Sequence, residues 1–535
     1  MSYLTTQPAT LAAAAADLTG IGSAIAEATA AASGRTSGLL AAALDEVSVA
    51  TATLFNSFAQ EGHAAIAQAG AFHAEFARAL SAAGNAYLSA EATNAAAAAT
   101  DVTLVMGGSG NPIPPLSYVN AVVSKYITPH FPAFTVGNAL GLFTPEAFYP
   151  LTGIKDLVPN VSVSEGVQIL DAAIKQQLTA GNSVAVLGFS QSSIISSLEM
   201  MALNPSGTPS PLDVVFTLLG NPMNPNGGML ARFPGLEMPS LGFTFYGATP
   251  ANSFETNIYT IEYDGFADFP QYPLNFLADL NALAGIYYVH GTYADLTPAQ
   301  INSAIHLTNT VGPTMTDYYM IPNPNLPLTQ GLRALPLIGT PLADLLEPNL
   351  RILVNLGYGS PDQGWSTGPP NVHTPFGLFP PVDPVDVMGR LAVGTQQGIH
   401  AFSNDIAFMA SQASLSDLAN VVTSAPLPSA DLIPRILANP VDSVNTIASA
   451  ISTGYSVLLP TADFATAAIF SVPAYNLQLF GEGLAQAATG DPLGLVNAIG
   501  RPIAADVALF SVAGGFEALV LISAMQSILG DLSSL

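Results

Sequence analysis

The stretch Val184–Leu203, VAVLGFSQSSIISSLEMMAL, decides the fold class. Its first four residues form an apolar run that predicts a buried strand, and apolar residues recur at helical spacing from residue 194 to residue 201. Gly188-Phe189-Ser190-Gln191-Ser192 lies between the two. A strand, a tight serine-bearing turn and a helix form the context of a nucleophile elbow, which lifts the serine out of the sheet. We interpret Ser190 as a candidate nucleophile, with the Gln191 N–H at the helix N-terminus as a donor to developing negative charge.

The pentapeptide departs from the usual G-x-S-x-G because Ser192 replaces the last glycine. A small residue is needed there, since the helix packs close to the strand. In a chain this rich in Gly, Ser and Ala, the motif alone has little specificity, and the flanking strand and helix support it. The alternative is an ordinary strand-to-helix turn with Ser190 as the N-cap.

The composition excludes several function classes. The 535 residues favour two or three domains. Charged residues make up only 9% of the chain, against about 25% in typical soluble domains, and 11 Lys and Arg oppose 37 Asp and Glu. A net charge of −26 repels nucleic acid, and the low charge density favours a lipid or cell-envelope environment. The absence of cysteine excludes disulfides and thiolate chemistry, and we expect neither a metal nor a cofactor.

Residues 1–99 are dominated by alanine and contain a single proline, Pro8. They predict a helix through Ala12–Ala32, a break at residues 33–38 and a second, longer helix, which together make an antiparallel hairpin. Two alanine-rich helices bury little apolar area, so a partner is expected. His63 and His73 are ten residues apart on the longer helix, which does not suit a metal pair. We see no ordinary signal peptide, since the first basic residue is Arg35.

This region resembles the mycobacterial PE domain. The resemblance rests on MSYLTTQPATLAAAAADLTGIGSAIAEA and ALDEVSVATATLFNSFAQEGHAAIAQAGAFHAEFARAL, although Pro8-Ala9 replaces the Pro-Glu pair that names the family. Tyr87 and Glu91 match the Tyr-x-x-x-Asp/Glu element of type VII secretion. The resemblance implies an export module that pairs with a PPE-family protein. It also implies secretion to the cell surface or cell wall without a cleaved Sec signal.

After residue 100 the pattern changes to alternating strands and helices. Residues 102–106, 184–187, 214–219 and 258–263 read as strands, and Ser162-x-x-Glu165 predicts a capping box that opens a helix to about Leu178. This alternation favours an α/β domain with a largely parallel sheet. The loop Gly107–Gly110 after the first strand lacks a following Gly-Lys-Ser/Thr, so we interpret it as an oxyanion loop that offers the amides of Gly108 and Ser109. A plain strand-to-loop turn is the alternative.

A serine nucleophile needs a base, and in this fold the chain order is Ser, acid, His. The histidines after Ser190 are His290, His306, His373 and His400. His290 follows the strand-like run Ile286–Val289 and precedes a turn, where a loop can present the ring. We therefore select His290. A surface or capping role is the alternative for any one of them.

The acid is expected after a strand between Ser190 and His290. Asp264 lies at a predicted strand end and Asp268 in the loop that follows. Asp279 falls on a predicted helix, and Asp213 precedes its strand. We favour Asp264 and keep Asp268 as the alternative.

Residues 100–330 resemble the PE-PPE domain, an α/β serine hydrolase module related to cutinases and lipases. The resemblance is carried by VMGGSGNPIPP, GFSQSS, YDGFADFPQYPLNFLADLNALAGIYYVHGTY and YYMIPNPNLPL. The family pentapeptide ends in Gly or Ser. The resemblance implies that Ser190 is the nucleophile, that His290 is the general base and acid, and that Asp264 orients His290. Cutinases hold the acid loop with a disulfide, which this chain lacks, and Phe266 replaces an aliphatic residue there.

The expected architecture is therefore an α/β-hydrolase (cutinase-like) domain at 100–330 with an N-terminal helical hairpin at 1–99. A Pro/Gly-rich connector packed on the hydrolase is expected at 331–387 and a helical region at 388–535. The last region could form a lid, an acyl-chain channel or a membrane-facing surface, and plain packing is favoured. The expected function is an exported esterase or lipase acting on acyl, chiefly fatty-acyl, esters, with peripheral envelope contact. The alternatives are an acyltransferase to a sugar or lipid hydroxyl and a non-catalytic surface protein.

Overall fold

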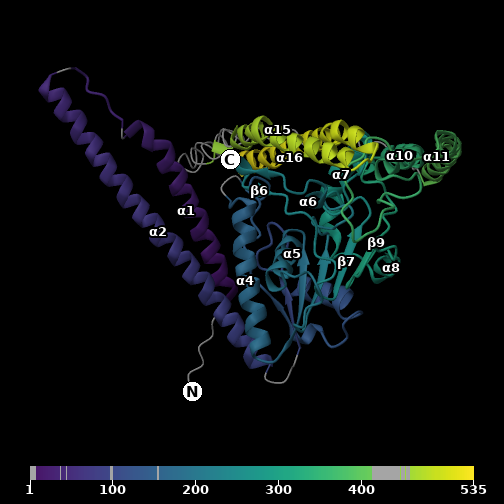
Figure 1. Cartoon of the computed structure of the whole chain (residues 1–535), viewed down its shortest axis with the longest axis horizontal. Coiled ribbons are helices and arrows are strands. Elements are labelled where there is room, and N and C mark those ends of the chain that lie inside the picture. Colours follow the sequence, from purple (N-terminus) through teal and green to yellow (C-terminus); the bar gives the residue numbers. More distant parts are fainter. Residues whose placement is uncertain are drawn as a thin grey trace.

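The computed structural model describes residues 8–36, 38–43, 45–96, 101–153, 156–412, 446, 452–453 and 458–534. The first two helices, α1 (Pro8–Thr36) and α2 (Glu46–Ala96), form the predicted hairpin, which projects from the body of the molecule (Figure 1). Small side chains are buried in the hairpin, among them Ala12, Ala15 and Ala77, while many large apolar side chains of α2 are exposed.

A seven-stranded sheet with the strand order β2-β1-β3-β4-β7-β9-β8 forms the centre of the body. All its pairs are parallel except β8 with β9, which confirms the expected mostly parallel sheet. The strands are β1 (Asp101–Val105), β2 (Ala139–Gly141), β3 (Ser183–Phe189), β4 (Val214–Leu219), β7 (Thr256–Ile261), β8 (Ile305–His306) and β9 (Thr316–Ile321). The central strands β3 and β7 are buried along almost all of their length, and β3 has the near-continuous apolar run that is typical of a strand covered on both faces.

Helices cover both faces of this sheet. On one face α4 (Pro159–Thr179) and α5 (Gln191–Leu203) pack against side chains such as Val186 and Phe216. On the other face α3 (Leu116–Val122), the π-helical turn η1 (Val123–Ile127) and the segment around α8 (Pro298–Asn302) pack against side chains such as Leu187. Further short elements are η2 (Val136–Asn138), α6 (Met229–Arg232), β5 (Glu237–Met238), η3 (Pro239–Leu241) and β6 (Phe243–Thr244).

The segment expected as a Pro/Gly-rich connector is more ordered than predicted. It contains the last three residues of α9 (Pro327–Arg333), all of α10 (Gly339–Asn355) and the turn η5 (Leu356–Tyr358), and α10 keeps Pro348 within its helix. Next comes α11 (Pro384–Gln412). Of the predicted C-terminal helical region, residues 413–445, 447–451, 454–457 and 535 lie outside the described residues.

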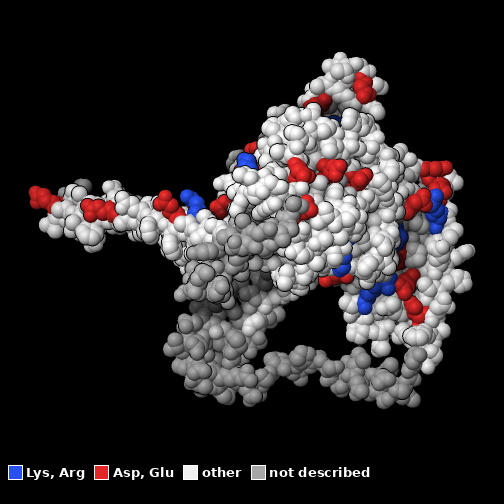
Figure 2. Space-filling view, turned by 90° about the horizontal axis from the view of Figure 1, so that it is seen from below, with Lys and Arg blue, Asp and Glu red and all other residues white. Residues whose placement is uncertain are grey.

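The last two helices, α15 (Leu458–Ala488) and α16 (Leu493–Ser534), form an antiparallel pair that lies across one end of the α/β body beside α6 and α7 (Phe276–Tyr288) (Figure 1). By length and composition alone, Leu11–Ala30 in α1 and Leu493–Ile528 in α16 are apolar enough to cross a membrane. Side chains of α16 also belong to the main hydrophobic core, including Ala504, Ala508 and Leu509. The face shown in Figure 2 is largely uncharged, with scattered acidic and fewer basic residues.

Candidate active site

Ser190 lies in the turn between β3 and α5, with φ 58° and ψ −117°. A non-glycine residue at positive φ is strained, and such strain is typical of a nucleophile elbow. Ser192, which replaces the last glycine of the motif, is fully buried, and its hydroxyl accepts a 2.7 Å hydrogen bond from the Phe189 N–H. The serine at this position therefore stabilises the turn.

Three side chains from distant parts of the sequence meet at this turn. His290 Nε2 lies 2.7 Å from Ser190 Oγ, and His290 Nδ1 lies 2.8 and 2.9 Å from the two carboxylate oxygens of Asp264. An ionised carboxylate only accepts hydrogen bonds, so Nδ1 carries the proton and Nε2 is free to accept from the serine hydroxyl. Ser190 and His290 are each 8% exposed and Asp264 is fully buried.

The three residues come from three different elements. Ser190 follows β3, Asp264 follows β7, and His290 begins the short helix η4 (His290–Thr292) after α7. The prediction of a strand before His290 was wrong, because Ile286–Tyr288 is the last turn of α7. The helix approaches the acid loop closely at Gly285, where a Cβ atom would lie only 1.8 Å from the Tyr263 carbonyl oxygen.

The other candidate acids have different partners. Asp268 Oδ2 accepts from the Tyr263 N–H at 3.1 Å, and burial raises the pKa of Asp268 well above its usual value. Asp279 accepts from Ser511 at 3.1 Å, and Asp213 accepts from Ser183. Among these four carboxylates, hydrogen bonds to His290 are made by Asp264.

The other three histidines after Ser190 do not occupy the position of His290, whose Nε2 faces the Ser190 hydroxyl. His306 lies in the exposed strand β8, and its Nε2 lies 3.0 Å from Oδ1 of the exposed Asp317. His373 lies in the irregular segment before α11 and His400 within α11. The described residues contain no group of three or more His, Asp or Glu side chains able to hold a metal ion.

Tyr293 is a site residue that the sequence analysis missed. Its hydroxyl donates to Asp264 Oδ2 at 2.7 Å and accepts from the Ile261 N–H at 2.9 Å. Burial, followed by the nearby Asp264 charge, raises the pKa of Tyr293 well above its usual value, so the hydroxyl remains a donor. No local motif marks this tyrosine, and its position three residues after His290 is the only signal.

The Gly-rich loop lies directly against Ser190. A Cβ atom on Gly108 would lie 2.8 Å from the Phe189 ring and 3.1 Å from Ser190 Cβ, so only glycine permits this approach. The Gly110 N–H donates to the Glu146 carbonyl at 2.7 Å, which ties the loop down. The backbone of Gly108 and Ser109 is therefore beside Ser190, together with the first residue of α5, Gln191.

The Gln191 side chain also links this loop to α4. Gln191 Nε2 donates to the Ala147 carbonyl at 2.9 Å and, more weakly, to Ser109 Oγ at 3.4 Å. Gln191 Oε1 accepts from the Ser162 hydroxyl at 2.8 Å. The predicted capping box was wrong: α4 begins at Pro159, and Ser162 lies inside it as a partner of Gln191.

A buried carboxyl lies behind the same loop. Glu146 is fully buried at φ 49°, and its Oε1 accepts from the Thr144 hydroxyl at 2.6 Å. Burial raises the pKa of Glu146 to about 8, despite the opposing effect of the Thr144 hydrogen bond. At neutral pH the carboxyl is therefore largely protonated.

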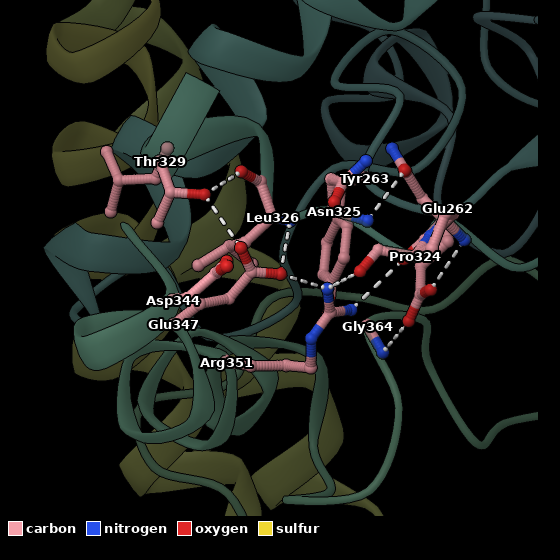
Figure 3. A network of polar contacts seen from close by, with 12 residues as sticks. Glu262, Tyr263, Pro324, Asn325, Leu326, Thr329, Asp344, Glu347, Arg351 and Gly364 are labelled. Carbon is pink, nitrogen blue, oxygen red and sulfur yellow. Dashed lines mark hydrogen bonds and ion pairs between the residues drawn. The ribbon is translucent and has the colours of Figure 1, made fainter. Parts of the chain in front are cut away.

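The acid loop is anchored by α10, which the sequence did not predict. The Tyr263 hydroxyl donates to Asn355 Oδ1 at 2.6 Å, and Glu262 accepts from the N–H groups of Asn323 and Gly364 at 3.0 and 2.8 Å. Figure 3 shows this network, in which Arg351 of α10 reaches across to the loop after β9. These contacts hold the segment before Asp264 in a chain that has no cysteine for a disulfide.

Glu347 is the centre of the α10 side of this network. Its carboxylate accepts from the Leu326 N–H, from Thr329, and from Arg333 and Arg351 at 2.6 and 2.7 Å. Burial opposes ionisation, but the hydrogen bonds from the two arginines hold the pKa of Glu347 below its usual value. The Arg333 ion pair therefore links α10 to α9, and the bond from the Leu326 N–H links α10 to the segment between β9 and α9.

A mostly apolar pocket opens at Ser190, with an empty volume of about 410 Å³ that includes space open to solvent. Its polar lining comes from Ser109, Ser190 and Gln191 together with Asn160 and the Tyr246 ring. Side chains such as Ile194, Leu230 and Phe266 supply the apolar wall. This arrangement suits a substrate with one polar reacting group and an apolar substituent.

Comparison with known proteins identifies two regions. Residues 4–94 match the PE family and residues 135–359 match the PE-PPE domain. The chain is 52% identical over 456 residues to the uncharacterized PPE family protein PPE28 of Mycobacterium tuberculosis, covering 84% of this chain and 69% of PPE28. It is 49% identical over 403 residues to Esterase PE16 of the same organism, covering 72% of this chain and 74% of PE16.

PE family protein PE3 of Mycobacterium tuberculosis is 42% identical over 424 residues, covering 75% of this chain and 88% of PE3. Two more distant relatives from that organism are named as acyltransferases. SL1278 acyltransferase Chp1 is 30% identical over 272 residues (49% of this chain, 65% of Chp1), and diacyltrehalose acyltransferase Chp2 is 28% identical over 320 residues (56% and 84%). The matching regions and the extent of these similarities show that the chain belongs to the PE family and carries a PE-PPE domain.

Proposed function

We propose that this protein is a serine esterase that cleaves acyl esters through an acyl-enzyme on Ser190. The observation that carries the proposal is the 2.7 Å separation of Ser190 Oγ and His290 Nε2, with Asp264 on the opposite ring nitrogen. The relative named Esterase PE16 supports the same type of activity.

In the proposed reaction Ser190 Oγ attacks the ester carbonyl carbon while His290 Nε2 takes the hydroxyl proton. Asp264 stabilises the resulting imidazolium and keeps the ring oriented. The oxyanion of the tetrahedral intermediate accepts hydrogen bonds from the Gln191 N–H and from the amides of Gly108 and Ser109. His290 then donates its proton to the leaving alcohol, and a water molecule repeats the sequence to release the acid.

The test compares wild type with Ser190→Ala on p-nitrophenyl butanoate. We expect a loss of about 10³-fold or more in kcat, since removing a triad nucleophile has an effect of at least this size. Wild type, and not the variant, should react with a fluorophosphonate probe at residue 190. Ser197→Ala is the matched control, because Ser197 is buried in the same helix with its hydroxyl bonded to Ser193 and Thr249. Equal ester cleavage by wild type and Ser190→Ala would remove the proposal.

Acyl transfer is the second candidate, favoured by the burial of Ser190 and by the two relatives named as acyltransferases. The same acyl-enzyme would then pass its chain to a sugar or lipid hydroxyl in place of water. The discriminating measurement incubates the enzyme with an acyl ester and trehalose and analyses the products by mass spectrometry. Release of free acid alone would exclude transfer to this acceptor.

We infer that the α1–α2 hairpin pairs with a PPE-family protein and directs export by type VII secretion to the cell envelope. Family membership supports this, as do the exposed apolar side chains of α2, including Leu54, Phe58 and Phe72. Tyr87 and Glu91 belong to α2, and their side chains lie outside the described residues. In a mycobacterial host we expect Tyr87→Ala to stay in the cytosol while wild type reaches the envelope or culture filtrate. Equal export of both would contradict the inference.

A further inference from the structure

A second apolar cavity lies between the α/β body and the C-terminal helix pair. Eighteen residues line it, and all are aliphatic, aromatic, Met or Pro. They come from the loop around Phe148, from α6 to β6, from Phe464–Val472 of α15 and from Leu509–Phe516 of α16. Its one polar lining group, the Tyr149 hydroxyl, donates to Asp463 at 2.6 Å. The empty volume is about 700 Å³, counting space open to solvent.

This cavity adjoins the pocket of Ser190. Phe148 and Phe243, whose rings are stacked with centroids 5.6 Å apart, line both spaces. A second connection runs from the His290 ring to Phe266 at 4.7 Å and from Phe266 to Phe516 of α16 at 6.0 Å. Phe516, which lines the second cavity, is therefore separated from the His290 ring only by Phe266.

We propose that this cavity holds the distal part of a long acyl chain whose carbonyl is bound at Ser190. The proposal rests on the esterase function proposed above and specifies its substrate class. A cavity without charge or an unsatisfied polar lining group offers no hydrogen bond or ion pair, so its occupant must be hydrocarbon. Its position beyond Phe148 and Phe243 means that only a chain longer than the Ser190 pocket can reach it.

The helix pair completes the site. Without α15 and α16 the cavity would be an exposed apolar surface on the α/β body, since both helices supply one of its walls. Phe510 lines the cavity and is also 57% exposed, which places its open side at the surface of α16. The C-terminal helices thus extend a short-chain pocket into a site for long chains.

The first test narrows the cavity and compares chain lengths. Ala513 of α16 and Ala468 of α15 line the cavity and are half-buried, so Phe at either position projects a ring into it. For each variant we expect the ratio of kcat/KM for p-nitrophenyl hexadecanoate to that for p-nitrophenyl butanoate to fall at least about tenfold, corresponding to the loss of two or more buried methylene contacts. Ala518→Phe and Ala465→Phe, exposed on the same two helices, are the matched controls and should keep the wild-type ratio.

An unchanged ratio in both Ala513→Phe and Ala468→Phe would overturn the proposal. Hydrolysis of p-nitrophenyl butanoate shows whether each variant is folded. If one variant no longer cleaves this short-chain ester, the test relies on the variant in the other helix. Wild type that cleaves neither ester would instead refute the esterase function itself.

The second test maps the chain directly in the unaltered protein. A hexadecyl fluorophosphonate with a terminal diazirine should label Ser190 and, on irradiation, crosslink to peptides from 464–472 or 509–516. Labelling of Ser190 with crosslinks only to other regions would overturn the cavity as the acyl site while leaving the esterase function intact. Absence of labelling at Ser190 would refute both.

Discussion

Replacing Tyr293 by Phe tests whether the Tyr293 hydroxyl holds Asp264 in the position from which it binds His290. The substitution removes a hydroxyl that donates to Asp264 Oδ2 and accepts from the Ile261 N–H, and it keeps the ring. Asp264 retains His290 and a 3.1 Å bond from the Phe266 N–H. The carboxylate therefore stays in place but loses one of its hydrogen bonds.

The size of the effect follows from these contacts. A hydrogen bond to a charged group contributes about 1.5–3 kcal/mol, and 1.4 kcal/mol corresponds to a tenfold change in rate. We expect kcat to fall about 10- to 100-fold, because a less firmly held Asp264 stabilises the imidazolium less well. KM should change little, since Tyr293 is 1% exposed and does not line the Ser190 pocket. The unpaired Ile261 N–H should also lower the free energy of unfolding by about 1–3 kcal/mol.

The assay is steady-state hydrolysis of p-nitrophenyl butanoate, combined with thermal unfolding. Tyr118→Phe is the matched control, because the Tyr118 hydroxyl is also buried but makes no hydrogen bond in the described part of the chain. It should retain wild-type kcat. A Tyr293→Phe variant with kcat within twofold of wild type, or with a raised KM at unchanged kcat, would refute this role for the hydroxyl.

Three further substitutions test the loop beside Ser190, the buried carboxyl behind it and the α10 network. Gly108→Ala should lower kcat and the rate of fluorophosphonate labelling about tenfold or more, because its Cβ would crowd Ser190 Cβ at 3.1 Å and displace the loop, and unchanged labelling would contradict this. Glu146 has a folded pKa of about 8, above an unfolded value of about 4.3, so its contribution to stability is complete below pH 4.3 and is lost as pH rises towards 8. Glu146→Gln should therefore reduce the fall in unfolding free energy between pH 5 and 8 by up to about 1.4 kcal/mol per pH unit. The measurement is the free energy of unfolding from urea denaturation at several pH values, and the same pH dependence in wild type and variant would contradict the prediction. Arg351→Ala should lower the free energy of unfolding by about 2–3 kcal/mol, because it removes one cation from Glu347, and a loss below 0.5 kcal/mol in urea denaturation would exclude this role.

The local sequence predicted those parts of the site that follow from chain direction and residue type. Ser190 is the predicted nucleophile because an apolar, β-branched run, a small-residue turn and a helical period occur together within twenty residues. Asp264 was selected because a parallel sheet brings all strand ends to one edge, and the structure places it there beside His290.

The parts that depend on tertiary contacts could not be predicted. Ile286–Val289 has the composition of a strand, but Tyr287 and Tyr288 are exposed at the end of a helix that begins at Phe276. Ser162 matched a capping pattern, yet its hydroxyl bonds to Gln191, which is 29 positions away. Similarly, the proline density of residues 331–387 concealed α10, since Pro348 is tolerated within that helix.

The length of α2 has a consequence for how this protein can meet other molecules. At 1.5 Å per residue its 51 residues extend about 75 Å. The exposed side chains of Leu40 and Val47 lie in or next to the segment that joins α1 to α2, at the free end of the hairpin. Figure 1 shows this end of the hairpin projecting away from the α/β body, which carries Ser190. If a PPE-family partner binds there, as proposed above, the partner and the substrate of the proposed Ser190 site occupy different parts of the protein, so we expect partner binding to leave ester cleavage unchanged.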